Sequence, residues 1–129
     1  MEMVEPKKYL ECFKEFPVVR RGKKPTELFE VVPKVYPLNI DEKKIRETVR
    51  QLKKKYPHLG YRIITATING KKCLGITRSK GIPVFFDPES GRVYVRWEDA
   101  IGNAEKTALV VHFRLTALKV PLALMKIEE

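Results

Sequence analysis

Every second residue of one short stretch is an arginine or a tyrosine, with valines between them: Arg92-Val93-Tyr94-Val95-Arg96. Neighbouring side chains of a β-strand point to opposite faces, so Arg92, Tyr94 and Arg96 would share one face. Guanidinium groups bind phosphate oxygens, and an aromatic ring between them offers a flat surface on which an unpaired base can stack. This pattern predicts contact with a polyanion that carries flat bases.

A hairpin turn must place this strand beside its partner. Asp87-Pro88-Glu89-Ser90-Gly91 separates two β-rich runs, and its proline and glycine suit a tight turn. If Asp87 pairs with Arg92, one face of the hairpin is apolar and belongs in a core: Ile82 with Trp97, Val84 with Val95, and Phe86 with Val93. The opposite face then carries Pro83, Phe85, Arg92, Tyr94 and Arg96, and we expect it to meet the polyanion.

A second hairpin precedes the first, because Asn69-Gly70 is a strong signal for a type I′ turn. Pairing Ile68 with Lys71 puts one set of residues on one face: Tyr61, Ile63, Leu74, Ile76 and Arg78. The other face carries Ile64, Ala66, Ile68, Cys73 and Gly75. The sequence leaves open which face continues the core. Together the two hairpins predict a four-stranded antiparallel meander over residues 61–97.

A basic amphipathic helix is expected before the meander, over residues 41–56. Asn39 with Glu42 forms a capping-box pattern, and an apolar stripe follows: Ile45, Val49, Leu52 and Tyr56. Cations cover the rest of this helix, and four of them are expected to contact phosphates: Arg46, Arg50, Lys53 and Lys54. The residues predicted to bind nucleic acid are these four together with Tyr61, Arg78, Phe85, Arg92, Tyr94 and Arg96.

The distribution of charge supports this assignment. The net charge is +10, and residues 41–97 hold fourteen Lys and Arg against five Asp and Glu. Residues 1–40 carry a net +2, and residues 98–129 a net −1. Concentrated basicity indicates a polyanionic partner, most simply nucleic acid, although a solvated face in a lysine-rich protein is the alternative.

The two ends of the chain are expected to be helical. Residues 6–16 place aromatic residues at helical spacing, and Thr26 can cap a short helix through Val32. Between them lies a basic run that is either a loop or an arm for phosphates: Arg20, Arg21, Lys23 and Lys24. Residues 107–118 fit a helix or a strand, and we favour an apolar C-terminal helix capped by Asn103. The run 104–129 is also a candidate oligomerisation element, which predicts a homodimer.

Other function classes find little support in the sequence. His58 and His112 are far apart, and Cys12 and Cys73 have no metal-ligand or redox spacing, so we expect no metal, no cofactor and no enzyme. Phosphate-binding glycine loops are missing. The 129 residues suit a single domain without a membrane-spanning run or signal-peptide pattern, which favours the cytoplasm. One glutamine and three asparagines beside so many charged residues are typical of a thermophile.

The order of the expected elements resembles that of one family. An N-terminal helical segment, the basic helix 41–56, the meander 61–97 and the apolar run 104–118 are similar to the ThermoDBP-type single-stranded-DNA-binding proteins of thermophilic archaea. The resemblance covers most of the chain at the level of architecture. It implies sequence-tolerant binding in a cleft between sheet and helices, with a C-terminal element that dimerises.

We therefore expect an α+β domain that binds nucleic acid, preferably single-stranded, with DNA or RNA left open. The alternative is a protein-interaction or assembly subunit whose apolar C-terminus binds a partner and whose basicity is incidental.

Overall fold

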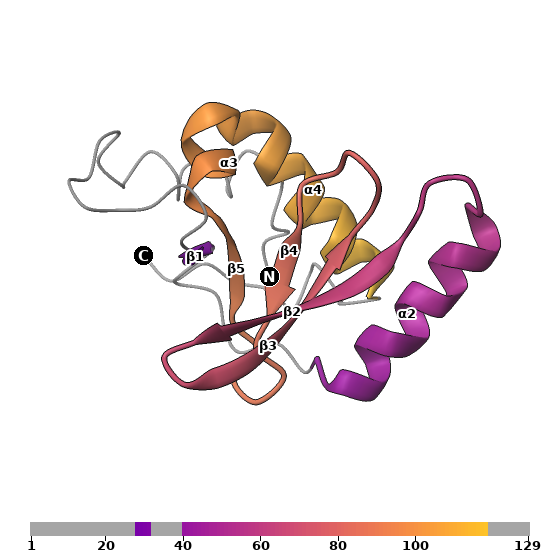
Figure 1. Ribbon diagram of the computed structural model, residues 1–129, viewed down its shortest axis with the longest axis horizontal. Helices are drawn as coiled ribbons and strands as arrows, with labels where there is room; N and C mark the ends of the chain where they lie inside the picture. Colours follow the sequence, from indigo (N-terminus) through magenta and orange to yellow (C-terminus); the bar gives the residue numbers. More distant parts are fainter. Residues whose placement is uncertain (1–27, 32–39, 119–129) are drawn as a thin grey trace, which may run out of the picture.

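An antiparallel sheet of five strands organises the computed structural model, which describes residues 28–31 and 40–118 (Figure 1). The strands lie in the order β1-β5-β4-β3-β2 and comprise β1 (Leu28–Val31), β2 (Arg62–Ile68), β3 (Lys71–Thr77), β4 (Val84–Phe86) and β5 (Val93–Arg96). The helices are α2 (Glu42–Lys55), α3 (Trp97–Gly102) and α4 (Ala104–Ala117). The predicted α+β class and the four-stranded meander, β2 to β5, are confirmed.

Both hairpins have the predicted register. Asn69 and Gly70 have φ angles of 52° and 78°, and Ile68 pairs with Lys71. In the other hairpin the Asp87 amide donates to the Arg92 carbonyl at 2.9 Å. Val84 pairs with Val95 and Phe86 with Val93, as expected. The expected pairing of Ile82 with Trp97 is not part of this ladder, because β5 ends at Arg96 and Trp97 begins α3.

The structure decides which face of the first hairpin is core. Leu74 pairs with Phe86 and Ile76 with Val84, so the face that begins with Tyr61 continues the apolar face of the second hairpin. Helix α2 packs against β2 and β3, and α4 packs against β4. Both helices contribute to the core on this face through Ile45, Val49, Ala108, Val111 and Leu115. We call this the helix-covered face.

Each long helix has a side-chain cap at its start. Asp41, and not the predicted Asn39, caps α2 by accepting a hydrogen bond from the Lys44 amide at 2.7 Å. Asn103 caps α4 as predicted, accepting from the Lys106 amide at 3.1 Å. Residues 104–117 are therefore helical, and the strand reading of this segment is excluded.

The short helix expected from Thr26 to Val32 is wrong over the residues that the structure describes. Residues 28–31 form β1, which pairs with β5 and places Val31 opposite Val93 in the core. A segment this short between Pro25 and Pro33 gains few helical hydrogen bonds, whereas a sheet edge offers partners along its whole length. The helix predicted over residues 6–16 and the candidate arm, Arg20, Arg21, Lys23 and Lys24, lie outside the described residues, as does the run after Leu118.

The opposite face of the sheet is less open than its sequence suggests. Pro83 is buried, and Phe85 is only 5% exposed. The Phe85 ring occupies the space above Gly75, since a Cβ on Gly75 would come within 2.7 Å of that ring. Cys73 is buried on the same face, where desolvation raises the pKa of its thiol. Phe85 therefore packs against the sheet and offers no ring face to a ligand.

Candidate functional site

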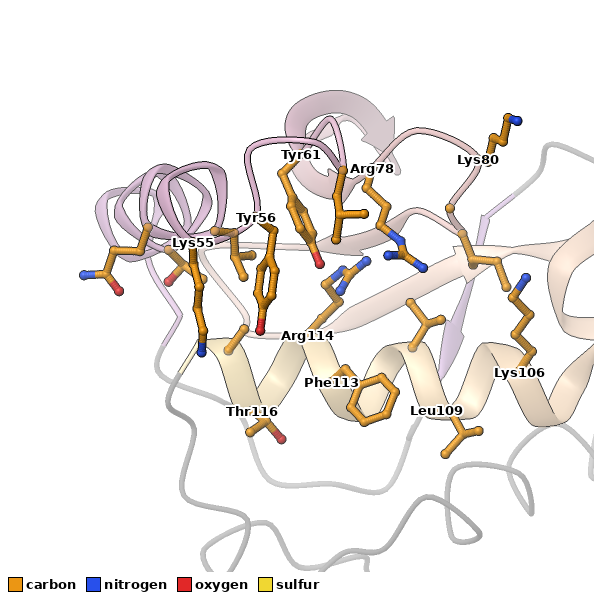
Figure 2. A pocket seen from close by; sticks show the side chains of 18 residues that line it. Lys55, Tyr56, Tyr61, Arg78, Lys80, Lys106, Leu109, Phe113, Arg114 and Thr116 are labelled. Atoms are coloured by element: carbon orange, nitrogen blue, oxygen red, sulfur yellow. The ribbon is translucent and has the colours of Figure 1, made fainter.

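A groove lies on the helix-covered side of the sheet, between the end of α2, the connection from β3 to β4, and α4 (Figure 2). Its volume is about 800 Å³, within the range of pockets that hold whole small ligands. Aromatic residues of the lining are Tyr56, Tyr61 and Phe113, and its cationic residues are Lys55, Arg78, Lys80, Lys106 and Arg114.

The charge of this groove has one sign. Five of its lining residues are Lys or Arg, and none of its lining residues is Asp or Glu. A concave surface with walls of low dielectric constant concentrates the field of such charges and raises the local concentration of anions. The groove is therefore electrostatically suited to a polyanion.

Arg114 is the most unusual of the five cations. Its side chain comes from α4 and is only 6% exposed. The guanidinium carbon lies 5.2 Å from the centroid of the Tyr61 ring, and the buried Nε has no hydrogen-bond partner. Burial lowers the pKa of Arg114; the Tyr61 side chain opposes this shift, and the positive charge of Arg78 adds to it. A buried guanidinium that interacts with a tyrosine and a second arginine leaves unused capacity to bind an anion.

Two exposed aromatic rings border the groove. Tyr56 at the end of α2 is 41% exposed, and Phe113 on α4 is 58% exposed. The Lys55 ammonium lies 5.4 Å from the centroid of the Tyr56 ring, and the Tyr56 and Tyr61 rings are 6.4 Å apart. Exposed rings beside cations are the combination with which proteins bind single-stranded nucleic acid.

Local backbone structure places Tyr61 and Arg78 in the wall of the groove. Gly60 has a φ of 68°, in the left-handed region, and turns the chain from α2 into β2, so that Tyr61 follows at once. The Ser79 amide donates to the Leu59 carbonyl at 3.0 Å, which joins this turn to the end of β3. A Cβ on Gly81 would lie 2.6 Å from Cγ of Arg78, so the glycine leaves room for the Arg78 side chain.

The groove gathers two of the ten residues predicted to bind nucleic acid, Tyr61 and Arg78. The predicted cations of α2 lie on its outer surface: Arg46 pairs with Glu42 at 3.1 Å, and Arg50 pairs with Glu47. The hydrogen bond between Arg50 and Glu47 lowers the pKa of that carboxyl group. Lys53 and Lys54 are exposed in the last turn of α2, next to Lys55, but do not line the groove.

The remaining four predicted residues, Phe85, Arg92, Tyr94 and Arg96, lie on the opposite face of the sheet. Arg96 binds Asp99 through two hydrogen bonds of 2.8 and 3.2 Å and pairs with Glu98 at 3.2 Å. Hydrogen bonding to Asp99 raises the pKa of Arg96. Arg92 is exposed and Tyr94 is half-buried, and both have further interaction partners. The sheet thus separates these residues from Tyr61 and Arg78.

Sequence reasoning missed Arg114, Tyr56 and Phe113 as site residues. A signal for Arg114 was present, because it lies three residues after Val111 and four before Leu118, on the apolar stripe of α4. An arginine at such a position is either paired in the core or part of a site.

The described residues contain no group of three or more His, Cys, Asp and Glu side chains that could hold a metal ion. No helix within the described ranges is both long and apolar enough to cross a membrane. Comparison with protein-family models, with curated proteins and with solved structures finds no match to this chain.

Proposed function

We propose that this protein binds single-stranded nucleic acid in the groove between α2, the β3–β4 connection and α4. The observation that carries the proposal is the composition of the groove lining, which combines five cations and three aromatic rings, two of them exposed, with no carboxylate. This combination addresses both parts of a nucleotide, since cations bind phosphates and rings stack on bases.

The cations have distinct places along the groove. Arg78 and Arg114 lie close together in the interior, whereas Lys55 and Lys106 come from α2 and α4 (Figure 2). A strand that follows the groove therefore meets positive charge from both helices and from the connection between β3 and β4. The exposed lysines next to the groove, Lys53 and Lys54, extend the basic surface along α2.

The exposed rings favour a single strand over a duplex. Tyr56 and Phe113 can stack only on bases that are not already stacked and paired within a duplex. The groove offers few side chains for reading base edges, chiefly Gln51, Thr48 and Thr116, so binding through phosphates and stacking is expected to tolerate many sequences. The resemblance to ThermoDBP-type proteins implies the same class of ligand.

A fluorescence-anisotropy titration tests the proposal. Single-stranded DNA, single-stranded RNA and double-stranded DNA of equal length are titrated at two salt concentrations with the wild-type protein and the Tyr56→Ala/Phe113→Ala variant. We expect the single strands to bind more tightly, all affinities to fall with salt, and the variant to lose affinity for single strands.

The Tyr94→Ala variant is the matched control, because Tyr94 is an aromatic residue on the other face of the sheet. If Tyr94→Ala weakens binding and the double variant does not, the site lies on that other face. If no oligonucleotide binds at low salt, the proposed function is wrong.

One observation favours a second candidate function, that of a protein-interaction or assembly subunit. Three apolar side chains on two helices are exposed: Ile101 on α3, and Leu109 and Phe113 on α4. A homodimer that light scattering detects equally at low and high salt, and that Phe113→Ala disrupts, would support this reading.

A further inference from the structure

The guanidinium groups of Arg114 and Arg78 point toward one another, with the hydroxyl end of Tyr61 beside them (Figure 2). Arg114 is buried, and Arg78 is half-buried. The structure describes no carboxylate in contact with Arg114, whose Nε has no hydrogen-bond partner. Two adjacent positive charges out of bulk water repel each other and are poorly solvated. Such an arrangement becomes favourable when an anion binds between them.

Other arginines, on α2 and β5, show that this pair is different. Arg46, Arg50 and Arg96 each have a carboxylate partner from their own helix or the adjoining one. Those arginines are more exposed than Arg114, yet they are the ones that are neutralised. The most buried guanidinium of the described residues thus has no carboxylate in contact with it.

We propose that Arg114, Arg78 and Tyr61 form a partly buried site for a phosphate monoester dianion. Such a group is the end of a phosphorylated strand or part of a phosphorylated small molecule. Its two negative charges match two guanidinium groups, and its free oxygens can accept paired N–H bonds in the planar geometry that arginine presents. The Tyr61 hydroxyl supplies a further donor.

The burial of Arg114 favours a monoester over a phosphate within a strand. An internal phosphodiester carries one charge and has a chain on both sides, and both chains would have to lie close to a guanidinium group that is only 6% exposed. A monoester is attached at one oxygen only, so its other oxygens can reach Arg114 while the rest of the ligand lies in the open part. The strand-end form of the site rests on the proposed function, whereas the phosphate site itself does not.

The first experiment uses inorganic phosphate and no nucleic acid. Isothermal titration calorimetry at pH 8 compares phosphate with chloride at matched ionic strength for the wild type, Arg114→Gln, Arg78→Gln and Arg50→Gln. We expect phosphate to bind the wild type and Arg50→Gln alike, and each of the other two variants to bind at least about tenfold more weakly, because each loses a charge-assisted contact. Arg50 is the control because it is exposed and already paired.

Two results would overturn the site: no heat of phosphate binding beyond that of chloride in the wild type, or equal phosphate affinity in the wild type and both variants. Arg78→Gln keeps the experiment decisive if Arg114→Gln fails to fold, because Arg78 lies at the less buried side of the pair.

The second experiment separates the two sources of the phosphate group. Oligonucleotides of one sequence are prepared with a 5′-phosphate, with a 3′-phosphate or with hydroxyl ends. If a strand end is the natural occupant, one of the two phosphorylated oligonucleotides should bind about tenfold more tightly than the oligonucleotide with hydroxyl ends. Arg114→Gln should abolish this difference. Equal affinity of all three forms, together with intact phosphate binding, assigns the site to a phosphorylated small molecule.

The two proposals fail in different ways. Phosphate binding without binding of any oligonucleotide overturns the proposed function and supports the phosphate site. Conversely, the protein could bind oligonucleotides in a salt-dependent way that Tyr94→Ala does not change, and yet not bind phosphate. That result overturns the phosphate site alone.

Discussion

The Arg114 guanidinium lies over the ring of Tyr61, with its carbon 5.2 Å from the ring centroid. Cation–π contact and the tyrosine hydroxyl compensate only part of the loss of hydration of a guanidinium that is almost fully buried. This residue is therefore expected to serve binding at the expense of stability.

The first prediction follows from this relationship. Arg114→Met keeps an unbranched side chain in the core but removes the buried charge and its repulsion with Arg78. We expect the free energy of unfolding, measured by urea denaturation without phosphate, to increase by about 1–3 kcal/mol. Arg50→Met, an exposed control, should change it by less than about 0.5 kcal/mol. A less stable Arg114→Met protein would show that the charge contributes to folding.

The second prediction concerns stacking. Tyr56→Ala and Phe113→Ala should each weaken binding of a single strand by about 1–3 kcal/mol if each ring stacks on one base. Both side chains are exposed, so thermal unfolding should change little. Ile101→Ala removes a comparably exposed apolar side chain outside the groove and should leave affinity unchanged. Equal affinity in all three variants would show that the groove does not hold bases.

The third prediction concerns the lysines of the groove. Lys55→Ala and Lys106→Ala each remove one candidate phosphate contact, so each should flatten the log–log dependence of affinity on salt by about 0.7. Arg50→Ala should flatten it less, because Glu47 already neutralises that arginine. Anisotropy at four or more salt concentrations measures the slopes. A larger change for Arg50→Ala would move the strand to the outer surface of α2.

The fourth prediction uses the close approach of Gly81 to Arg78. In Gly81→Ala the new methyl group would lie 2.6 Å from Cγ of Arg78, so the Arg78 side chain must move. We expect phosphate affinity in calorimetry to fall about as far as in Arg78→Gln, with Arg114 unchanged. Gly102→Ala is the control, because a Cβ there meets no atom within 4 Å. If Gly81→Ala binds phosphate as tightly as the wild type, phosphate binding does not depend on the exact position of the Arg78 side chain.

The fifth prediction is a dependence of stability on pH. Burial raises the pKa of Asp87, but hydrogen bonds from the Glu89 and Ser90 amides and the Ser90 side chain outweigh it, and the net shift is downward. A carboxyl group whose pKa is lower in the folded state stabilises the fold above its unfolded pKa of about 3.9. This contribution should disappear as the pH falls through the folded pKa.

Asp87→Asn should therefore be less stable than the wild type at pH 7, by about 1 kcal/mol, and the difference should shrink below pH 4. Urea denaturation at several pH values measures it. A difference that is constant from pH 7 to pH 2 would assign the effect of the substitution to packing and not to charge.

The sequence by itself determined the hairpins and the long helices. Asn69-Gly70 and the Asp87–Gly91 turn set the strand registers, because turn geometry depends on a few adjacent residues. Apolar spacing located α2 and α4 for the same reason, since each pattern lies within one continuous segment. Local chemistry was thus sufficient for the meander and its flanking helices.

Only the tertiary structure decided which faces are covered. Alternation separates the two faces of a strand but does not say which one a helix will bury, so Tyr61 and Arg78 could not be separated from Arg92 and Tyr94 in advance. The same limit applies to β1, whose pairing with β5 depends on residues far along the chain. The position of Arg114 on the apolar stripe of α4 was visible in the sequence. Its role as an anion-binding residue followed only once packing had placed it beside Tyr61 and Arg78, because burial without a carboxylate is a property of the folded molecule.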